Sequence, residues 1–239
     1  MNPLEGQVAV ITGASSGIGR GVAHELDAAG MRLVLTARRA NRLESLADEL
    51  ESVAVVVGDV THEDMPRRLI DAALESFGRC DAVLNNAGIM DTGPIDSVDV
   101  DRLCRNVRVN FEAAVRIAYA ALRQFKAQGS GYLINTSSIL GTKVRPTAGV
   151  YAGTKYGIEA LTEALRIEVA GTGIRVGCIE PGLVMTELQD HFEVHPRDML
   201  GIERPLEPAD IARVVRFMLE QPPHVVIPRI MVLPSEQPM

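Results

Sequence analysis

A tyrosine and a lysine four residues apart, Tyr151 and Lys155, form the pair of side chains best suited to acid–base chemistry in this sequence. The pattern around them predicts a helix over residues 147–171. Four residues turn a helix by about 400°, so the two side chains lie on one face, about 40° apart. A free phenol has a pKa near 10, and a nearby ammonium lowers it, which allows the tyrosine to exchange a proton with a substrate oxygen. Taken singly, such a tyrosine is more often a half-buried structural residue and such a lysine a solvated charge. Whether the pair is catalytic therefore depends on the motifs in the rest of the chain.

Two serines, Ser137 and Ser138, stand at the end of a predicted strand, residues 131–137. A hydroxyl at this position can donate a hydrogen bond to a carbonyl oxygen and polarise it, as an oxyanion-hole donor does. Serines at strand ends also act as caps, and Ser137 is an alternative donor to Ser138.

A glycine-rich segment, TGASSGIG at residues 12–19, connects a predicted strand to a predicted helix. Gly13, Gly17 and Gly19 allow a tight turn and a close approach of the backbone to a ligand. The free N–H groups at the start of the following helix then face a pyrophosphate. The spacing is G-x-x-x-G-x-G, and a plain turn is the alternative that the strand–loop–helix context makes less favourable.

The second predicted strand ends at TARRANR, where a dinucleotide-binding fold that uses NAD would carry an acidic residue for the ribose 2′-hydroxyl. Here Arg38 and Arg39 follow Ala37, so no neighbouring carboxylate repels a 2′-phosphate and two guanidinium groups are available to bind one. The sequence therefore favours NADP(H) over NAD(H). Ordinary surface arginines at the start of the next helix are the alternative.

The elements that must position these residues alternate along the chain, short runs rich in β-branched residues with longer helical patterns. Strands this continuous in Val, Ile and Leu are typical of a sheet covered on both faces, and the alternation predicts right-handed crossovers and a doubly wound parallel sheet. Ligands bind such sheets beyond the carboxyl ends of the strands. The predicted strands are 7–12, 32–37, 53–58, 80–86, 131–137, 174–180 and 229–233, and the predicted helices are 17–29, 41–51, 63–77, 99–127, 147–171 and 208–220.

Composition narrows the function classes. The chain has 239 residues, of which 46% are hydrophobic, and its net charge of −7 argues against a nucleic-acid-binding surface. The N-terminus has no signal-peptide pattern and no apolar run is long enough for a membrane span. The three widely spaced cysteines, Cys80, Cys104 and Cys178, fit reduced thiols in a cytoplasmic protein.

In their order and spacing these motifs resemble the short-chain dehydrogenase/reductase family, over nearly the whole chain. The matching segments are TGASSGIG, GDVT at 58–61, NNAG at 85–88, and PG at 181–182. The resemblance implies four catalytic residues: Asn110, which anchors a proton-relaying water, Ser138, Tyr151, and Lys155, which also binds the nicotinamide ribose. It implies that the cofactor is held by Gly13, Ser15, Ser16, Gly17, Ile18, Gly19, Arg38, Arg39, Asp59 (at the adenine), Val60, Asn86, Ala87, Gly88, Tyr151, Lys155, Pro181, Gly182, Val184 and Thr186. No metal-ligand set is predicted.

Asn110 also has a structural interpretation. It lies within an apolar helical stretch, VRVNFEAAV, where an asparagine can satisfy a local kink in the helix with its own amide. In the family the two roles occur together.

The resemblance implies a single Rossmann-type α/β domain, residues 1–239, with about seven parallel strands, helices on both faces and a substrate loop at about 183–207. It implies an NADP(H)-dependent oxidoreductase that interconverts a secondary alcohol or hydroxy acid and its ketone or aldehyde. The branch most similar in its motifs includes serine-type 3-hydroxy acid dehydrogenases and clavaldehyde-type reductases. The alternatives are an NAD(H)-dependent, epimerase or lyase variant of the site, and a non-catalytic dinucleotide-binding regulatory protein. In the loop, His191, His195, Arg197 and Arg204 are candidates for contact with a carboxylate, and a solvated lid is the alternative.

The partners implied are a small carbonyl or alcohol substrate and further copies of the chain, in a homotetramer built as a dimer of dimers. A stripe of small residues runs along the predicted helix 147–171, on the side opposite Tyr151 and Lys155. Its members are Gly149, Gly153, Gly157, Ala160 and Ala164. Close approach of another backbone would explain these helical glycines, and packing within the same chain is the alternative.

Overall fold

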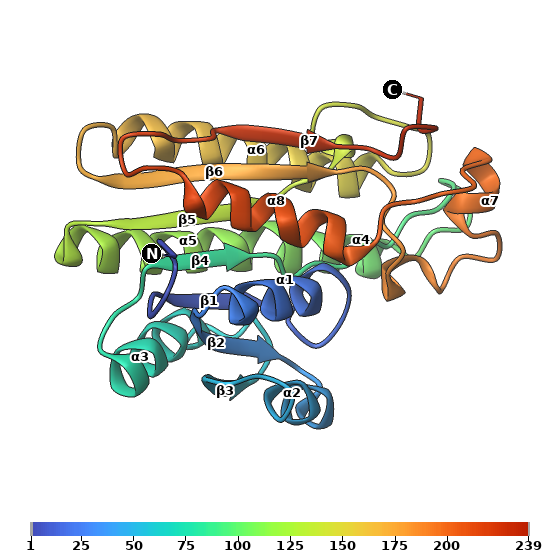
Figure 1. Cartoon of the computed structure of the whole chain (residues 1–239). Coiled ribbons are helices and arrows are strands. Elements are labelled where there is room, and N and C mark those ends of the chain that lie inside the picture. Colours follow the sequence, from blue (N-terminus) through green and yellow to red (C-terminus); the bar gives the residue numbers. More distant parts are fainter. Residues whose placement is uncertain (1, 239) are drawn as a thin grey trace.

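The computed structural model describes residues 2–238 and contains one seven-stranded sheet in the order β3-β2-β1-β4-β5-β6-β7 (Figure 1). Every neighbouring pair of strands is parallel, so the predicted doubly wound sheet is confirmed. The chain crosses from β3 at one edge back to β4 beside β1, which opens a crevice at the carboxyl ends of these central strands. The strands are β1 (Val8–Thr12), β2 (Arg32–Ala37), β3 (Val53–Val57), β4 (Ala82–Asn85), β5 (Gly131–Thr136), β6 (Ile174–Pro181) and β7 (Arg229–Val232).

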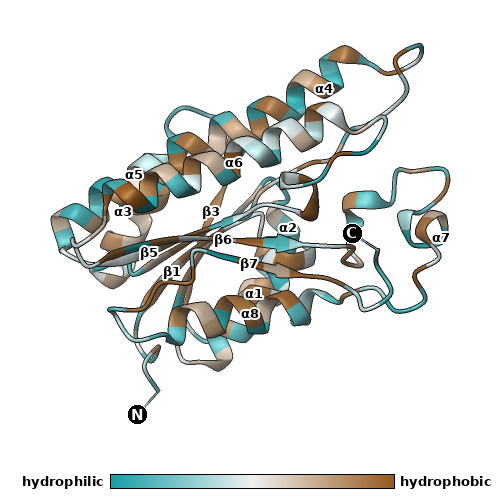
Figure 2. Cartoon of the chain, turned by 90° about the horizontal axis from the view of Figure 1, so that it is seen from above, coloured by the Kyte–Doolittle hydropathy of each residue, from teal (hydrophilic) through white to brown (hydrophobic). Residues whose placement is uncertain are grey.

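Helices cover both faces of the sheet, as Figure 2 shows. One face carries α1 (Gly17–Ala28), α2 (Ala40–Ala47) and α8 (Pro208–Glu220), and the other carries α3 (Met65–Phe77), α4 (Val100–Val107), α5 (Ala113–Gln128) and α6 (Gly149–Glu168). Side chains alternate between the two cores: on β2, Leu33 and Leu35 pack toward α1 and α2, whereas Val34 packs toward α3. Because both sides of the strands are buried in this way, the strand sequences are continuous apolar runs.

The predicted helix 99–127 is interrupted in the structure. It comprises α4, a π-helical turn at Arg108–Glu112 and then α5. Asn110 lies in this turn, and π-turns within helices frequently mark functional positions. The helix is therefore irregular at Asn110, but the Asn110 amide bonds the Ile89 backbone after β4 instead of the backbone of its own helix.

The stretch 183–207 contains two short helices: a 3₁₀ turn at Glu187–Gln189, and α7 (Pro196–Leu200). Figure 1 shows α7 projecting beyond the carboxyl ends of the strands. Pro196 at the first helical position and Gly201 in the left-handed region bound this short helix.

The glycine stripe on α6 divides into two parts. A Cβ atom at Gly149 or Gly153 would meet nothing within 4 Å, whereas one at Gly157 would lie 2.8 Å from the Phe111 ring of the π-turn. Gly157 is thus accounted for by packing within the chain, and Gly149 and Gly153 face open space.

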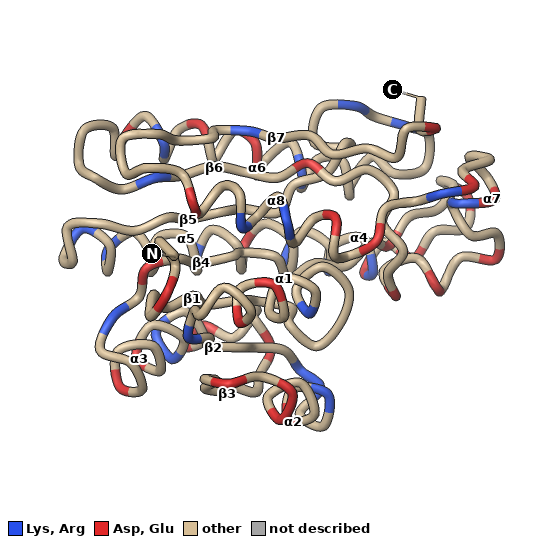
Figure 3. Tube along the Cα trace, in the orientation of Figure 1, with Lys and Arg blue, Asp and Glu red and all other residues tan. Residues whose placement is uncertain are grey.

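Charged residues of both signs are interspersed along the chain (Figure 3). No helix within residues 2–238 is both long and apolar enough to cross a membrane. All three cysteines are free; Cys80 and Cys178 are buried and Cys104 is exposed.

Candidate active site

A cleft of about 710 Å³ opens at the carboxyl ends of the strands, within the usual size range for ligand sites. It is lined by every residue implied to be catalytic or cofactor-binding except two, Gly19 and Asn110. The lining residues come from the segments after all seven strands and from helices α4 and α6, so the fold brings together segments distributed over most of the chain.

The glycine loop after β1 is shaped by close backbone contacts. Gly13 and Gly17 have φ values of 69° and 53°, which L side chains rarely adopt. A Cβ at Gly13 would lie 3.0 Å from the Ala87 backbone, and one at Gly19 would collide with the carbonyl of Gly13. Ser16, at the N-cap of α1, makes no side-chain capping bond, so it leaves the first helical N–H groups for a ligand. This cradle fits a pyrophosphate.

Arg39 is the guanidinium that borders this cradle. Its Nη2 donates to Ser15 Oγ at 3.0 Å and to Ser16 Oγ at 2.7 Å, and its Nη1 pairs with Glu187 at 2.6 Å. Arg42 also pairs with Glu187. The sequence shows no acid after β2, and Glu187 reaches this place from the segment after β6, far along the chain. Hydrogen bonds from Arg39 and Arg42 lower the pKa of Glu187, and burial acts in the opposite direction.

Asp59 and Val60 line the next part of the cleft, after β3. Asp59 accepts hydrogen bonds from the Thr61 N–H at 3.0 Å and hydroxyl at 2.8 Å. Burial raises the pKa of Asp59, but these bonds and the charges of Arg38 and His62 outweigh it, so the pKa lies below its ordinary value. Asp59 is therefore an anionic hydrogen-bond acceptor at neutral pH.

The NNAG segment after β4 is tied to β1 through Thr12. The Thr12 hydroxyl accepts from the backbone N–H groups of Asn86 and Ala87, both at 2.9 Å, and Asn86 Nδ2 donates to the Thr12 carbonyl at 3.0 Å. A Cβ at Gly88 would lie 3.4 Å from Asn110 Oδ1 and 3.9 Å from Lys155 Nζ. Gly88 thus forms part of the surface against which the catalytic candidates lie.

Asn110 stands behind the cleft. Its Oδ1 accepts from the Ile89 N–H and its Nδ2 donates to the Ile89 carbonyl, both at 2.8 Å. The π-turn points this amide toward the β4 loop, so Asn110 fixes the segment that continues from NNAG.

Tyr151, Lys155 and Ser138 share one wall of the cleft. The Lys155 ammonium lies 5.8 Å from the centre of the Tyr151 ring and donates to the Thr136 carbonyl at 2.8 Å. Ser138 caps the short 3₁₀ turn Ile139–Gly141 through a 3.1 Å bond from the Leu140 N–H. The helix therefore places both members of the pair on one face, as the spacing predicts.

The pKa of Tyr151 differs from the sequence expectation. Burial raises it to about 12, while a hydrogen bond with Ser138 and the charge of Arg145 act in the opposite direction. Burial also lowers the pKa of Lys155 to about 8, although the charge of Glu159 raises it. Burial is the largest effect on both groups, and the spacing of the two residues in the sequence does not reveal it.

The segment after β6 closes the other wall. Gly182 donates to the Val232 carbonyl at 2.7 Å and Leu183 donates to the Gln237 side chain at 2.8 Å. Val184 is buried in the core, and the Thr186 side chain lies 3.0 Å from where a Cβ at Gly17 would stand. The C-terminal segment thus holds Pro181–Thr186 over the glycine loop, a contribution the sequence did not reveal.

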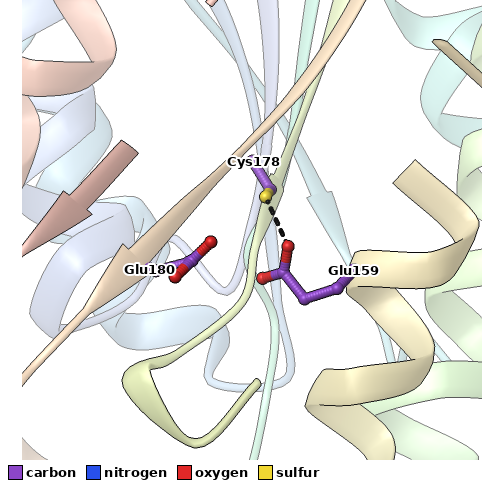
Figure 4. Close-up of side chains that lie close together, drawn as sticks. All are labelled: Glu159, Cys178 and Glu180. Carbon is purple, nitrogen blue, oxygen red and sulfur yellow. Dashed lines mark hydrogen bonds between the residues drawn. The ribbon is translucent and has the colours of Figure 1, made fainter. Parts of the chain in front are cut away.

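Figure 4 shows a buried acidic cluster that includes Glu159, the residue one helical turn beyond Lys155 on α6. Glu159 of α6 accepts a bond from the Cys178 thiol at 3.1 Å, and Glu180 lies beside them on β6. Arg229 of β7 pairs with Glu159 at 3.2 Å and with Glu180 at 2.9 Å. Burial and the neighbouring Glu159 raise the pKa of Glu180, with Arg229 opposing them.

Among the loop residues offered as carboxylate contacts, only His191 lines the cleft. The His195 ring accepts the Arg197 N–H, and the Arg197 guanidinium donates to the carbonyls of Ile202 and Glu203. The backbone N–H of Arg204 donates to Glu236. Arg145, in contrast, lines the cleft beside Tyr151 and went unnoticed in the sequence because it stands in a loop without a motif.

Comparison with known proteins agrees with this geometry. Residues 7–196 match the family described as short chain dehydrogenase. An uncharacterized oxidoreductase of Staphylococcus aureus is 38% identical over 236 residues, covering 98% of this chain and all of the relative. The closed form of a serine dehydrogenase complexed with NADP+ superposes with a TM-score of 0.91 at 25% identity, covering 98% and 97% of the two chains. A 3-ketoacyl-(acyl-carrier-protein) reductase from Brucella melitensis complexed with NADH gives a TM-score of 0.89 at 30% identity, covering 98% and 99%.

Proposed function

The chain belongs to the short-chain dehydrogenase family, and on that premise we propose that it is an NADP(H)-dependent enzyme that interconverts a secondary alcohol or hydroxy acid with its ketone or aldehyde. That it is an oxidoreductase of this family follows from the relatives. The observation that carries the finer proposal is the wall of the cleft on which Tyr151, Ser138 and Lys155 meet beside the glycine loop.

The residues present fit a dinucleotide. In this proposal the N–H groups at the start of α1 hold the pyrophosphate, Asp59 and Val60 border the adenine, and Arg38 or Arg39 binds the 2′-phosphate. Asn86, Ala87 and Gly88 support the central part, and Lys155 with Pro181, Gly182, Val184 and Thr186 holds the nicotinamide half. When bound, the nicotinamide supplies the hydride for reduction or accepts it in oxidation.

The protein's own part in the reaction is proton transfer. In reduction, the hydroxyls of Ser138 and Tyr151 donate hydrogen bonds to the carbonyl oxygen, and the proton of Tyr151 passes to that oxygen as the carbon becomes a C–H centre. The positive charge of the Lys155 ammonium then stabilises the negative charge of the phenolate. In oxidation the same proton leaves the alcohol oxygen for Tyr151. Asn110, through its hold on Ile89, keeps the β4 loop in place behind the reacting groups.

At neutral pH the two groups are in the protonation state that carbonyl reduction requires. The phenol, with a pKa of about 12, carries its proton, and the ammonium, with a pKa of about 8, is charged. This is the state required to donate a proton to a carbonyl oxygen.

An NAD(H)-dependent enzyme is the second candidate, and one contact favours it. Glu187 reaches Arg39 from across the cleft, and a carboxylate near the adenosine ribose disfavours a 2′-phosphate. The relative solved with NADH shows that members of the family with this fold bind that cofactor too.

A cofactor and substrate screen tests the proposal. Titrations of NADPH and NADH, followed by turnover of ketones, aldehydes and hydroxy acids, should show tighter binding of NADPH. Charge-assisted pairing with the 2′-phosphate is expected to give about a ten- to a hundred-fold preference. The double variant Arg38→Ala/Arg39→Ala should lose that preference, and equal binding of the two cofactors by the wild type would count against the NADP(H) assignment.

The proposal extends to the setting of the enzyme. We take residues 1–239 as one catalytic domain in a cytoplasmic protein, with 183–207 as its substrate loop. The active form is proposed to be a homotetramer, in which the open glycine stripe of α6 contacts a second copy.

A further inference from the structure

The substrate side of the cleft combines apolar walls with basic side chains. Its apolar residues include Met90, Ile139, Leu140, Leu183, Leu188 and Leu200. Besides Arg102, which is paired with Asp91, three basic residues line the same space: Arg105 on α4, and Lys143 and Arg145 on the loop between β5 and α6. The protein as a whole is acidic, with a net charge of −7, so the overall composition does not account for a basic wall at this place.

Acidic residues do not balance this wall. Asp91 is engaged by Arg102, whose Nε and Nη2 lie 2.9 and 2.5 Å from one Asp91 oxygen. Glu187 is engaged by Arg39 and Arg42. Within residues 2–238, neither Arg105, Lys143 nor Arg145 has an ion-pair partner.

Arg145 is the most enclosed of the three. Its Nε is buried and has no hydrogen-bond partner among the described residues. An N–H group enclosed without a partner costs free energy, and it is one of the groups that a ligand oxygen can satisfy.

The loop that carries Arg145 has a conformation of its own. Pro146 follows Arg145 directly, and Thr147 adopts a φ of 68°, in the left-handed region that a β-branched residue rarely occupies. The Thr147 carbonyl accepts a 3.1 Å hydrogen bond from the Gly93 N–H, which anchors the loop to the segment after β4. Strained backbone of this kind persists where the surroundings impose it, and it is common in ligand-binding segments.

Arg145 lines the same cleft as Tyr151, and its charge lowers the pKa of the Tyr151 phenol against the larger effect of burial. An anion bound to the Arg145 guanidinium would therefore stand close to the carbon that is oxidised or reduced. The apolar residues would surround the rest of a small substrate.

We propose that the substrate carries an anionic group, a carboxylate or a phosphate, and that Arg145 binds it, with Lys143 and Arg105 adding positive charge at the rim. This inference rests on the proposed function, since it concerns the alcohol or ketone that the enzyme turns over. Arg145 is then a specificity-determining residue. A guanidinium binds a planar carboxylate or a phosphate through parallel N–H bonds, and such charge-assisted pairing in a partly enclosed site gives about a ten- to a hundred-fold preference over a neutral group.

Matched pairs of probes test this directly. The enzyme–NADPH complex is titrated with acetoacetate and its neutral methyl ester, and with dihydroxyacetone phosphate and neutral dihydroxyacetone. Binding is followed by NADPH fluorescence and turnover by NADPH absorbance. The first pair reports a carboxylate and the second a phosphate. The variant Arg145→Met removes the charge and keeps much of the bulk, and Arg123→Met, on the exposed side of α5 away from the cleft, is the matched control.

The expected result is that at least one anion binds ten-fold or more tightly than its neutral counterpart, that Arg145→Met abolishes this ratio, and that Arg123→Met leaves it unchanged. Added guanidinium ion should restore part of the preference in an Arg145→Ala variant, which a merely misfolded loop would not show. The inference is overturned if neither anion is preferred, or if the preference survives Arg145→Met. Preferred binding of neutral ketones with NADPH turnover would overturn it while leaving the proposed function intact, whereas failure to bind NADPH would instead remove the proposed function.

Discussion

Arg39 and Glu187 form a 2.6 Å ion pair between residues 148 positions apart in the chain. One lies between β2 and α2 and the other in the segment after β6, so the pair joins the two sides of the cofactor cleft. Their side chains are 40% and 44% exposed, which leaves the pair weak enough for a ligand to replace it. Glu187 is thus paired with the Arg39 guanidinium, which a 2′-phosphate would otherwise bind.

Removal of the Glu187 charge should tighten binding of NADP+. In Glu187→Gln, Arg39 and Arg42 lose their competing carboxylate, and a phosphate no longer meets a negative charge. We expect about a two- to five-fold lower Kd for NADP+, the range of an exposed ion pair, with little change for NAD+. Isothermal titration of both cofactors measures this, with Glu193→Gln in the same segment as the control. An unchanged or weaker affinity for NADP+ would show that Glu187 does not compete with the phosphate.

The pH dependence of reduction should follow Lys155. Its ammonium is present below its pKa of about 8 and is lost as the pH rises through that value, whereas Tyr151, at about 12, keeps its proton over the same range. The kcat/KM for ketone reduction should therefore be level below about pH 8 and decline above it. Because the Glu159 carboxylate raises the pKa of Lys155, Glu159→Gln should move this decline to lower pH.

Glu163→Gln, on the exposed side of α6, serves as the control for that profile. A Glu159→Gln profile that coincides with the wild type, in a variant that binds NADPH normally, would exclude Lys155 as the group that titrates.

Two substitutions on α6 should separate assembly from folding. Gly153→Leu projects into open space, so it should lower the mass measured by light scattering while leaving the melting temperature of the protomer nearly unchanged. Gly157→Leu meets the Phe111 ring and should lower the melting temperature, by several degrees if the cost is 1–3 kcal/mol, about the usual cost of overpacking. A wild type that is strictly monomeric, or a Gly153→Leu variant of unchanged mass, would rule out this face as an interface.

The sequence predicted those features that depend on local pattern. The continuous apolar runs predicted the strands, because the sheet is covered by helices on both faces. The glycine spacing predicted the cradle before α1. The α6 periodicity placed Tyr151 and Lys155 on one face. Each of these depends on residues close together in the chain.

The features that the sequence did not predict depend on contacts between distant segments. Glu187 reaches Arg39 only because the segment after β6 folds back over the glycine loop. Phe111 reaches Gly157 because the π-turn bulges from the helix. The pKa of Tyr151 moves opposite to the expectation because burial, which no motif encodes, outweighs the Ser138 hydrogen bond and the charge of Arg145.

The central claim, that Tyr151 transfers the proton in an oxidoreductase reaction, is tested most directly by Tyr151→Phe with the substrate found in the screen. Single-turnover oxidation of NADPH should fall by more than a hundred-fold, because general acid–base catalysis contributes about 10²–10⁴-fold, while the Kd for NADPH stays within about two-fold of the wild type. Lys155→Ala, in comparison, should harm both turnover and NADPH binding. A Tyr151→Phe enzyme that retains more than about a hundredth of the wild-type rate would contradict the assignment of Tyr151 as the proton donor.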